Sequence, residues 1–205
     1  MKKITLASAA LALALASQAQ AAAGDWMIRA RALGVISQEG STISPASVGG
    51  KADIDNSLVP EVDFTYFFTD NIAAELIAAV TPHDVTAKGT SLGDVDAGSA
   101  WLLPPTLTLQ YHITGIEGVK PYVGAGVNYT VFFNEDGGAL DPVSYDDGFG
   151  WALQAGVDIP VESNWYVNLD VKKIFLNTDA KFSGGVVADV DIDPLLVGAG
   201  VGYRF

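Results

Sequence analysis

The stretch LLVGAGVGYRF, residues 195–205, decides the fold. Its side chains alternate between two sets. The first set is Leu195, Val197, Ala199, Val201, Tyr203 and Phe205, and the second is Leu196, Gly198, Gly200, Gly202 and Arg204. Successive side chains of a β-strand point to opposite faces, so this period of two predicts a strand with one continuous apolar face.

The same alternation recurs along most of the chain. It predicts eight strands, near residues 25–36, 58–68, 72–81, 100–113, 120–133, 148–159, 165–175 and 191–205. Short connections at 69–71, 114–119 and 160–164 interleave with long ones at 37–57, 82–99, 134–147 and 176–190. An even strand number with alternating short and long connections is typical of outer-membrane barrels.

Aromatic residues gather near the ends of these strands, as in the interfacial girdles of a membrane barrel. They are Trp26, Tyr66, Phe67, Phe68, Trp101, Tyr111, Phe133, Trp165, Tyr203 and Phe205. A soluble β-sandwich would also alternate, but the loop lengths and the terminal aromatic favour the barrel. We therefore predict an all-β fold, an eight-stranded antiparallel transmembrane β-barrel.

The composition excludes several classes of function. Eleven Lys and Arg stand against 24 Asp and Glu in 205 residues, so no basic field exists to bind nucleic acid. The chain has no Cys, which excludes disulfides, thiol nucleophiles and thiolate metal sites. Two His leave little room for an imidazole metal site, so we expect neither a metal nor a cofactor.

Residues 1–21 have the pattern of a secretory signal peptide. Lys2 and Lys3 precede an apolar run at 4–16, and Ala19-Gln20-Ala21 supplies a small-x-small cleavage site. No later segment has 18 uninterrupted apolar residues, so no membrane-spanning helix is expected. The barrel is predicted to span residues 22–205 in the bacterial outer membrane, with both mature termini periplasmic because the strand number is even.

The side chains that face the barrel interior differ along its length. The lower, periplasmic half receives most of the charged and polar groups, with two acids at mid-height or just below. The predicted polar plug comprises Arg29, Arg31, Glu61, Asp63, Glu75, His112, Asp158, Asp170 and Arg204. Buried charges are costly unless paired, so Arg29, Arg31 and Arg204 are expected to pair with these acids and to close the pore.

The upper half is predicted to form an apolar vestibule lined by Leu33, Val35, Val59, Leu102, Pro104, Phe132, Ile174 and Leu196. Prolines also interrupt the upper strands. Proline removes a ladder donor, so Pro60, Pro104 and Pro105 are candidates for a lateral seam in the wall. The alternative is a proline bulge that only shapes the rim.

The external loops are rich in aspartate, namely Asp94, Asp96, Asp136, Asp141, Asp146, Asp147, Asp189, Asp191 and Asp193. They indicate either a divalent-cation site or a solvated anionic rim. No twelve-residue calcium-binding loop occurs, which favours the rim. An enzyme is not expected, because no serine accompanies His112 in its strand, and His83 with Asp84 reads as a solvated surface pair.

Several motifs resemble the outer-membrane protein W (OmpW) family. They are Thr69 to Leu76, Pro104-Pro105-Thr106-Leu107, Lys120 to Gly124 with Gly126, Asn128 and Tyr129, Gln154 to Asp158, and Asp193-Pro194 with Gly202 to Phe205. The resemblance spans nearly the whole mature chain and includes alkane-import relatives. It implies an eight-stranded barrel with a hydrophobic lumen, linked to uptake of small hydrophobic molecules, with outer-membrane lipid and these solutes as its partners. We therefore expect passive uptake of small hydrophobic molecules with lateral release into the membrane. The alternative function is a structural, adhesive or receptor barrel that presents acidic external loops.

Overall fold

The computed structural model describes residues 23–44, 49–91, 93–138, 143–182 and 187–205. The predicted signal peptide therefore lies outside the described residues. Eight strands form the ring: β1 (Trp26–Ile36), β4 (Ser57–Phe67), β5 (Ile72–Ala79), β8 (Thr106–His112), β9 (Lys120–Asp136), β11 (Gly148–Glu162), β12 (Trp165–Phe182) and β14 (Leu195–Arg204).

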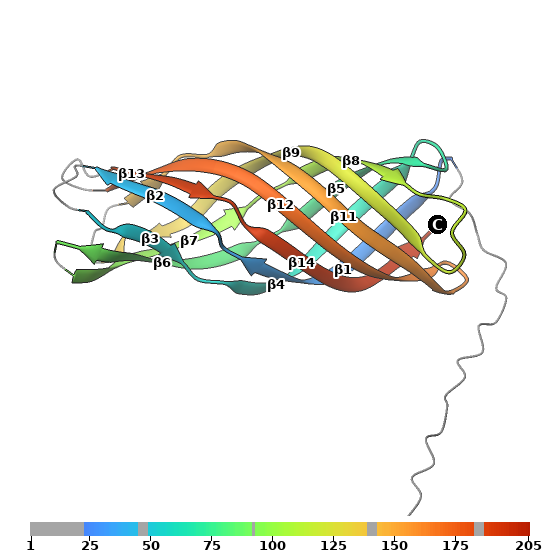
Figure 1. Ribbon diagram of the computed structural model, residues 1–205, viewed down its shortest axis with the longest axis horizontal. Coiled ribbons are helices and arrows are strands. Elements are labelled where there is room, and N and C mark those ends of the chain that lie inside the picture. The colour runs from blue at the N-terminus through green and yellow to red at the C-terminus, as the bar shows by residue number, and fades with distance from the viewer. Residues whose placement is uncertain (1–22, 45–48, 92, 139–142, 183–186) are drawn as a thin grey trace, which may run out of the picture.

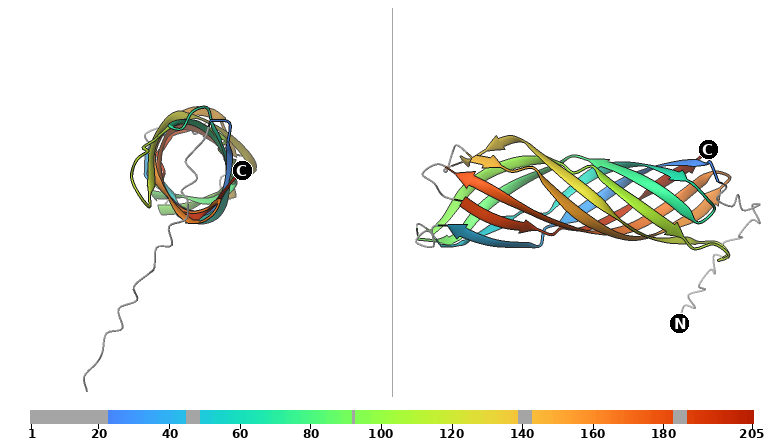
Figure 2. Two further views of the ribbon diagram at one scale, coloured as in Figure 1. Left: turned by 90° about the vertical axis from the view of Figure 1, so that its right-hand side faces the viewer. Right: turned by 90° about the horizontal axis from the view of Figure 1, so that it is seen from above.

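Each of these strands pairs antiparallel with its two neighbours in the ring. The order is β1-β4-β5-β8-β9-β11-β12-β14. The first and last strands close it through ten register pairs, from Met27↔Arg204 to Ile36↔Leu195. Viewed along its axis, the molecule is a closed ring of ribbons (Figure 2). The predicted eight-stranded antiparallel barrel is confirmed.

The barrel is longer than predicted at one end. Segments expected to be external loops contain further strands: β2 (Glu39–Ser44), β3 (Lys51–Ile54), β6 (Thr81–Thr90), β7 (Gly93–Leu103), β10 (Val143–Tyr145) and β13 (Val187–Ile192). They continue the wall away from the C-terminus (Figure 1). We call this the extended end, and we call the opposite end, with the C-terminus and the short turns, the turn end.

The residue content of the added strands explains why these segments were predicted to be loops. In β13 the inward residues are Ala188, Val190 and Ile192, while Asp189 and Asp191 point outward. The alternation persists, but its polar face carries acids and its apolar face begins with alanine. The predicted strand at 100–113 is also split, because Pro104 and Pro105 separate β7 from β8.

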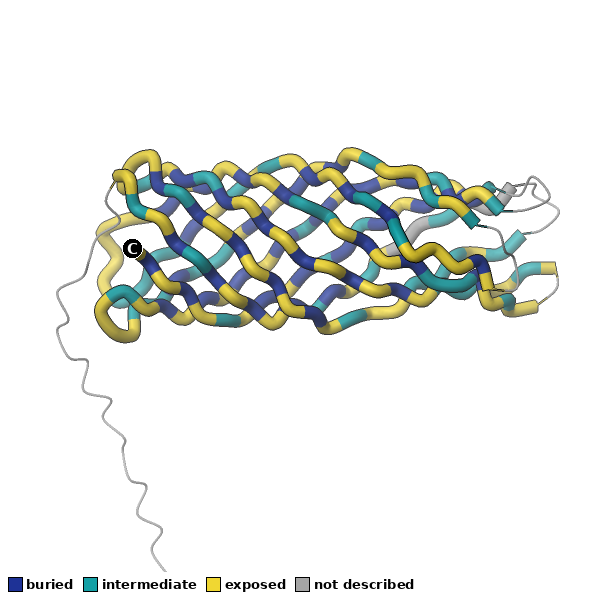
Figure 3. Tube along the Cα trace, turned by 180° about the vertical axis from the view of Figure 1, so that it is seen from behind, coloured by how far each residue is buried: buried dark blue, intermediate teal, exposed yellow. Residues whose placement is uncertain are grey.

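Outward side chains form the apolar belt that a membrane barrel requires. Buried and exposed residues alternate along the strands (Figure 3). Aromatic pairs stand at both edges of the belt: Trp26–Tyr66 and Trp165–Tyr203 at the turn end, and Trp101–Phe133 and Tyr129–Phe149 toward the extended end. Phe67 was expected in this girdle, but it is only 1% exposed and lies inside the barrel. Among the described residues no helix is long and apolar enough to cross a membrane.

Candidate functional site: the barrel interior

Two arginines on β1 organise the interior. Arg29 and Arg31 point inward because they alternate with outward-facing Ala30, and both are almost completely buried. The neighbouring strand β14 offers glycine at the same level. A Cβ atom at Gly198 would lie 3.2 Å from Arg31 Cδ, and one at Gly202 would lie 3.2 Å from Arg29 Cγ. The glycine face of residues 195–205 therefore makes room for the two guanidinium groups.

Arg29 spans the interior from β1 to β11. Its Nε and Nη2 donate to the two carboxylate oxygens of Asp158 at 3.0 and 2.7 Å. Its Nη1 donates to Thr65 Oγ1 at 2.6 Å and to Asp63 Oδ1 at 3.1 Å, and reaches Glu75 Oε1 at 3.3 Å. The bidentate geometry with Asp158 is the strong form of an arginine–carboxylate pair.

Arg31 joins the acids of β4 and β5. Its Nε forms an ion pair with Glu61 Oε1 at 2.7 Å, and its Nη2 donates to Glu75 Oε1 at 2.9 Å and closely to Asp63. Its Nη1 lies 3.5 Å from Asp170 Oδ2 and donates to Asn168 Oδ1 at 3.0 Å. Glu75 and Asp63 thus contact both arginines, which makes the four side chains one unit.

A third cation, Lys172, was missing from the predicted plug. Its Nζ donates to Glu61 Oε1 at 3.0 Å and to Asp170 Oδ1 at 2.9 Å, and the side chain is 1% exposed. The signal was present in the sequence, because Lys172 follows Asn168 and Asp170 at the period of two. We define the charge network as Arg29, Arg31, Lys172, Glu61, Asp63, Glu75, Asp158 and Asp170.

Neutral donors satisfy the surplus of acceptors in the network, which has three cations and five carboxyl groups. Glu75 Oε2 accepts from Gln110 Nε2 at 2.8 Å and from Gln154 Nε2 at 2.7 Å. Asp170 Oδ2 accepts from the Tyr122 hydroxyl at 2.6 Å. Seven of the eight ring strands contribute a polar side chain to this layer, and β14 contributes the glycines.

Arg204 and His112 lie nearer the turn end than the charge network. Arg204 Nε donates to Asp25 Oδ2 at 2.9 Å, and its guanidinium stacks over Phe67 at 4.2 Å. The expectation that Arg204 pairs with Glu61, Asp63, Glu75, Asp158 or Asp170 was wrong, because Arg29 lies deeper and occupies Asp158. His112 is buried between Phe67 and Tyr122, and its Nε2 lies 2.9 Å from Gln110 Oε1.

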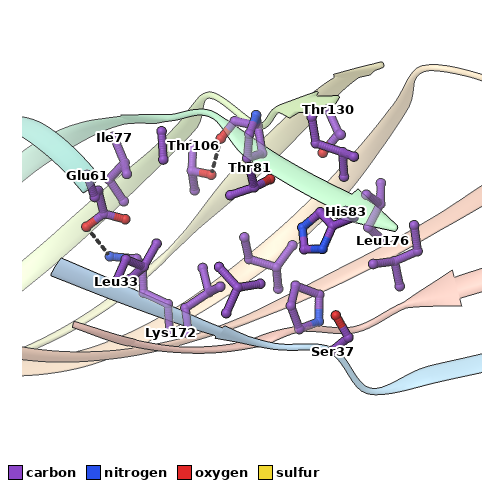
Figure 4. Close-up of a pocket in the computed structure, with 18 residues that line it drawn as sticks. Leu33, Ser37, Glu61, Ile77, Thr81, His83, Thr106, Thr130, Lys172 and Leu176 are labelled. Atoms are coloured by element: carbon purple, nitrogen blue, oxygen red, sulfur yellow. Dashed lines mark hydrogen bonds and ion pairs between the residues drawn. The ribbon is translucent and has the colours of Figure 1, made fainter. Parts of the chain in front are cut away.

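On the extended side of the network lies an apolar cavity of about 50 Å³, which we call the outer cavity. Its walls are lined by Leu33, Val35, Ile77, Ala79, Leu102, Pro104, Ile174, Leu176, Ile192, Pro194 and Leu196, with Ser37, Thr81, His83, Thr106 and Thr130 as polar members. Glu61 and Lys172 line the side next to the network (Figure 4). Six of the eight predicted vestibule residues line this cavity. Val59 belongs to the same buried cluster as Leu33, Ile174 and Leu196. Phe132 packs farther out, with Ala100 and Val190.

His83 corrects a further expectation. It is not a solvated loop residue but lies on β6 with 9% exposure, facing the outer cavity. Its Nδ1 lies 3.2 Å from the Asp55 carbonyl oxygen. Burial lowers the pKa of His83 below its ordinary value, which favours the neutral ring. Strand alternation across 81–90 would have revealed this placement.

The family model for OmpW matches residues 22–205. The chain belongs to the OmpW family. It is 48% identical over 185 residues to an uncharacterized outer-membrane protein, y4mB, of Sinorhizobium fredii, covering 88% of this chain and 80% of that relative. It is 35% identical over 161 residues to the dibenzothiophene metabolism operon protein PahQ of Pseudomonas aeruginosa, covering 77% and 76% of the two chains. The crystal structure of the outer membrane protein OprG from Pseudomonas aeruginosa matches with a TM-score of 0.83 and 32% identity, over 90% of this chain and 97% of OprG.

Membership of the OmpW family confirms the predicted location in the bacterial outer membrane. The relatives are outer-membrane barrel proteins rather than enzymes. Two of the motifs that carried the resemblance border the barrel interior. Pro104 lines the outer cavity, and Gly202 of the 195–205 face lies beside Arg29 of the charge network.

The wall of this OmpW-family barrel is interrupted beside the outer cavity. Pairing of β5 with β8 ends at Ile77↔Thr106, and pairing of β6 with β7 starts at Thr81↔Leu102. Between them, residues 78–80 have no ladder pairs with residues 103–105. On the side that faces β9, the proline pair keeps a backbone hydrogen bond, because the Tyr129 amide donates to the Pro105 carbonyl at 3.1 Å.

Residues 78–80 also lack part of their ladder pairing on the other side, toward β4. Pairing of β4 with β5 ends at Glu61↔Ala79, whereas Pro60 pairs only with Ala32 of β1. Pro60 is exposed on the outer surface, and Pro104 lines the outer cavity. The three predicted seam prolines therefore flank one stretch, residues 78–80, from two sides.

The aspartates of the extended end make local contacts. Asp189 and Asp191 each accept a hydrogen bond from Asn177 Nδ2, and Asp146 pairs with exposed Lys181. Asp141 lies outside the described residues. No group of three or more acidic, His or Cys side chains in the described part of the chain is arranged to hold a metal ion. The anionic rim stays a prediction.

Proposed function

We propose that this OmpW-family barrel takes up small hydrophobic molecules passively. The observation that carries the proposal is the outer cavity, whose walls are mainly apolar and which ends against the charge network. A solute enters from the extended end, loses its contact with water among Leu33, Leu176 and Leu196, and stops at Glu61 and Lys172. The name of the PahQ relative, a dibenzothiophene metabolism operon protein, supports an apolar solute of this kind.

The extended end faces the outside of the cell in this proposal. The turns at the other end are short. Outer-membrane barrels have short turns on the periplasmic side and longer loops on the extracellular side. Both mature termini then lie in the periplasm. The acidic residues of the extension form the solvated outer rim.

The proposed exit is sideways into the membrane. The charge network offers an apolar solute no gain, whereas hydrocarbon stabilises each buried CH₂ by about 0.8 kcal/mol relative to water. The interrupted ladders beside residues 78–80 lie at the height of the outer cavity. Pro60, Pro104 and Pro105 remove amide donors there, so this part of the wall separates at the least cost.

The test fills the outer cavity and compares uptake of a fluorescent apolar probe, N-phenylnaphthylamine, by cells that lack other OmpW-family proteins. Leu196→Trp adds bulk to a cavity of about 50 Å³ and is expected to abolish most of the uptake. Leu109→Trp makes the same change on the lipid-facing side, where Leu109 is 61% exposed, and is expected to have no effect. Equal uptake by the two variants, both folded and equally abundant, would refute passage through the cavity.

The exit route has its own test. Replacing Pro104 and Pro105 together with Val restores amide donors opposite residues 78–80 and is expected to stabilise the barrel and slow uptake. Binding of the probe to the purified double variant is measured as well, because Pro104 also lines the outer cavity and a loss of binding would slow uptake without involving the seam. Unaltered uptake by the folded double variant rules out this seam without affecting the assignment of the outer cavity.

The runner-up function is a structural or receptor barrel that presents its acidic rim. It rests on the outward acids of the extension, such as Asp189 and Asp191. Asp189→Asn with Asp191→Asn would then abolish partner binding, whereas Leu196→Trp would not.

A further inference from the structure

A second cavity, of about 30 Å³, opens at the turn end of the barrel. It is lined by Met27, Phe67, Asp70, His112, Ile113, Thr114, Gly115, Ile116, Val119, Lys120, Asp158 and Arg204. The charge network lies between this turn-side cavity and the outer cavity. A ligand here therefore comes from the opposite side of the barrel from the solutes considered above, and the inference does not rest on the proposed function.

Arg204 is the unusual member of the lining. Its side chain is only 4% exposed, and Nε donates to Asp25. Its Nη2 has no hydrogen-bond partner in the part of the chain that the structure describes. A buried guanidinium nitrogen without an acceptor is costly, and the Arg204 side chain that carries it lines the turn-side cavity.

The acids near Arg204 do not supply that acceptor. Both carboxylate oxygens of Asp158 are occupied by Arg29, and Asn168 also donates to Oδ1. Asp25 Oδ2 accepts from Arg204 Nε, and Asp70 is exposed in the turn. Lys120 adds a second positive charge to the same lining. The missing partner has the chemistry of an anion.

The rest of the lining favours an organic anion over an inorganic one. Met27, Ile113 and Ile116 give the cavity an apolar side, and the Phe67 ring lies under the guanidinium at 4.2 Å. This stacking fixes the plane of the guanidinium, and a planar carboxylate is matched to that fork. We propose that the turn-side cavity binds a small carboxylate with a short alkyl chain, its carboxylate on Arg204 and its chain against the isoleucines.

The test uses the full barrel in zwitterionic phosphatidylcholine nanodiscs with isotope-labelled isoleucine methyl groups. Butyrate is titrated against butanol, which has the chain without the charge, and against inorganic phosphate, which has the charge without the chain. Butyrate is expected to shift the Ile113 and Ile116 signals saturably, and neither comparison compound should do so. Equal shifts from butanol would overturn the proposal, and saturable shifts from phosphate would overturn the carboxylate class.

Three variants locate the charge. Arg204→Gln should weaken butyrate binding by about tenfold or more, the equivalent of one charge-assisted hydrogen bond. Lys120→Gln, which leaves the Arg204–Asp25 pair intact, should weaken it less. Asp25→Asn keeps an acceptor for Nε but removes the competing negative charge, so it should tighten binding. Lys88→Gln at the extended end is the control and should change nothing.

The opposing directions keep the test decisive if Arg204→Gln fails to fold. Unchanged affinity in both folded Lys120→Gln and Asp25→Asn would overturn the assignment, and so would weaker binding in Asp25→Asn.

Discussion

The charge network predicts a specific non-additivity between Arg29 and Asp158. Arg29→Met keeps an unbranched side chain but removes the guanidinium group, and with it the two hydrogen bonds to Asp158 and those to Thr65 and Asp63. Asp158 is then left with Asn168 Nδ2, 2.8 Å from Oδ1, as a donor. Asp63 and Glu75 keep Arg31, so the damage centres on Asp158.

The expected magnitude follows from the burial of both groups, which are 0% and 2% exposed. Removing one partner of a buried pair costs about 3–5 kcal/mol, because the remaining charge keeps its desolvation penalty. Adding Asp158→Asn removes that stranded charge. The double variant should therefore be more stable than the sum of the single changes predicts, by about 1–3 kcal/mol.

The assay is reversible urea unfolding in phospholipid vesicles, followed by the fluorescence of the four tryptophans. Lys181→Met, which removes the exposed pair with Asp146, is the matched control and should unfold like the wild type. An Arg29→Met variant within about 1 kcal/mol of the wild type, or strictly additive effects in the double variant, would refute the network as described.

Three further outcomes are expected. In planar bilayers the barrel should show at most small, rare openings, whereas stable currents that scale with salt would contradict a closed interior. Gly202→Val should destabilise the barrel more than Gly34→Val, because a Cβ at 202 meets Arg29 Cγ at 3.2 Å, whereas one at 34 meets only the Val197 carbonyl oxygen at 3.7 Å. Equal urea midpoints would contradict this. Burial lowers the pKa of His83, so below about pH 6.5 the unfolded chain binds more protons than the folded one and the barrel loses stability as the pH falls. His83→Gln should reduce that loss of stability between about pH 7.5 and pH 5. Parallel pH profiles of the variant and the wild type would show that His83 contributes nothing to it.

The period of two was sufficient to predict the ring, because it is set by local strand geometry and survives in a single sequence. It also placed Arg29, Arg31 and Asp158 in one layer. Lys172 was missed although it follows the same period, since a lysine near a strand end also fits a solvated loop. His83 was misplaced for a related reason. The expected loop at 82–99 contains most of β6 and of β7, and the buried positions there are His83, Ala87 and Ala97 in place of large apolar residues.

Partners across the barrel could not be predicted in this way. The sequence gives each residue a face and an approximate height, but not its position around the ring after the strands tilt. Arg204 shows the consequence. It faces inward as expected, yet Arg29, two register pairs above on the neighbouring strand, reaches Asp158 first, and Arg204 turns to Asp25 and Phe67.

The charged layer has a functional rationale that stability alone does not supply. A buried ion network is often no more stabilising than apolar side chains of the same volume, so an apolar fill would serve an inert barrel equally well. For a protein that admits hydrophobic solutes, an apolar fill would extend the outer cavity toward the periplasm and let solutes partition along the axis. The network ends the apolar region at Glu61 and Lys172, beside the interrupted ladders of residues 78–80. In the proposed function, the network therefore directs a solute to the wall, and the absence of ladder pairs at that height gives it a way through.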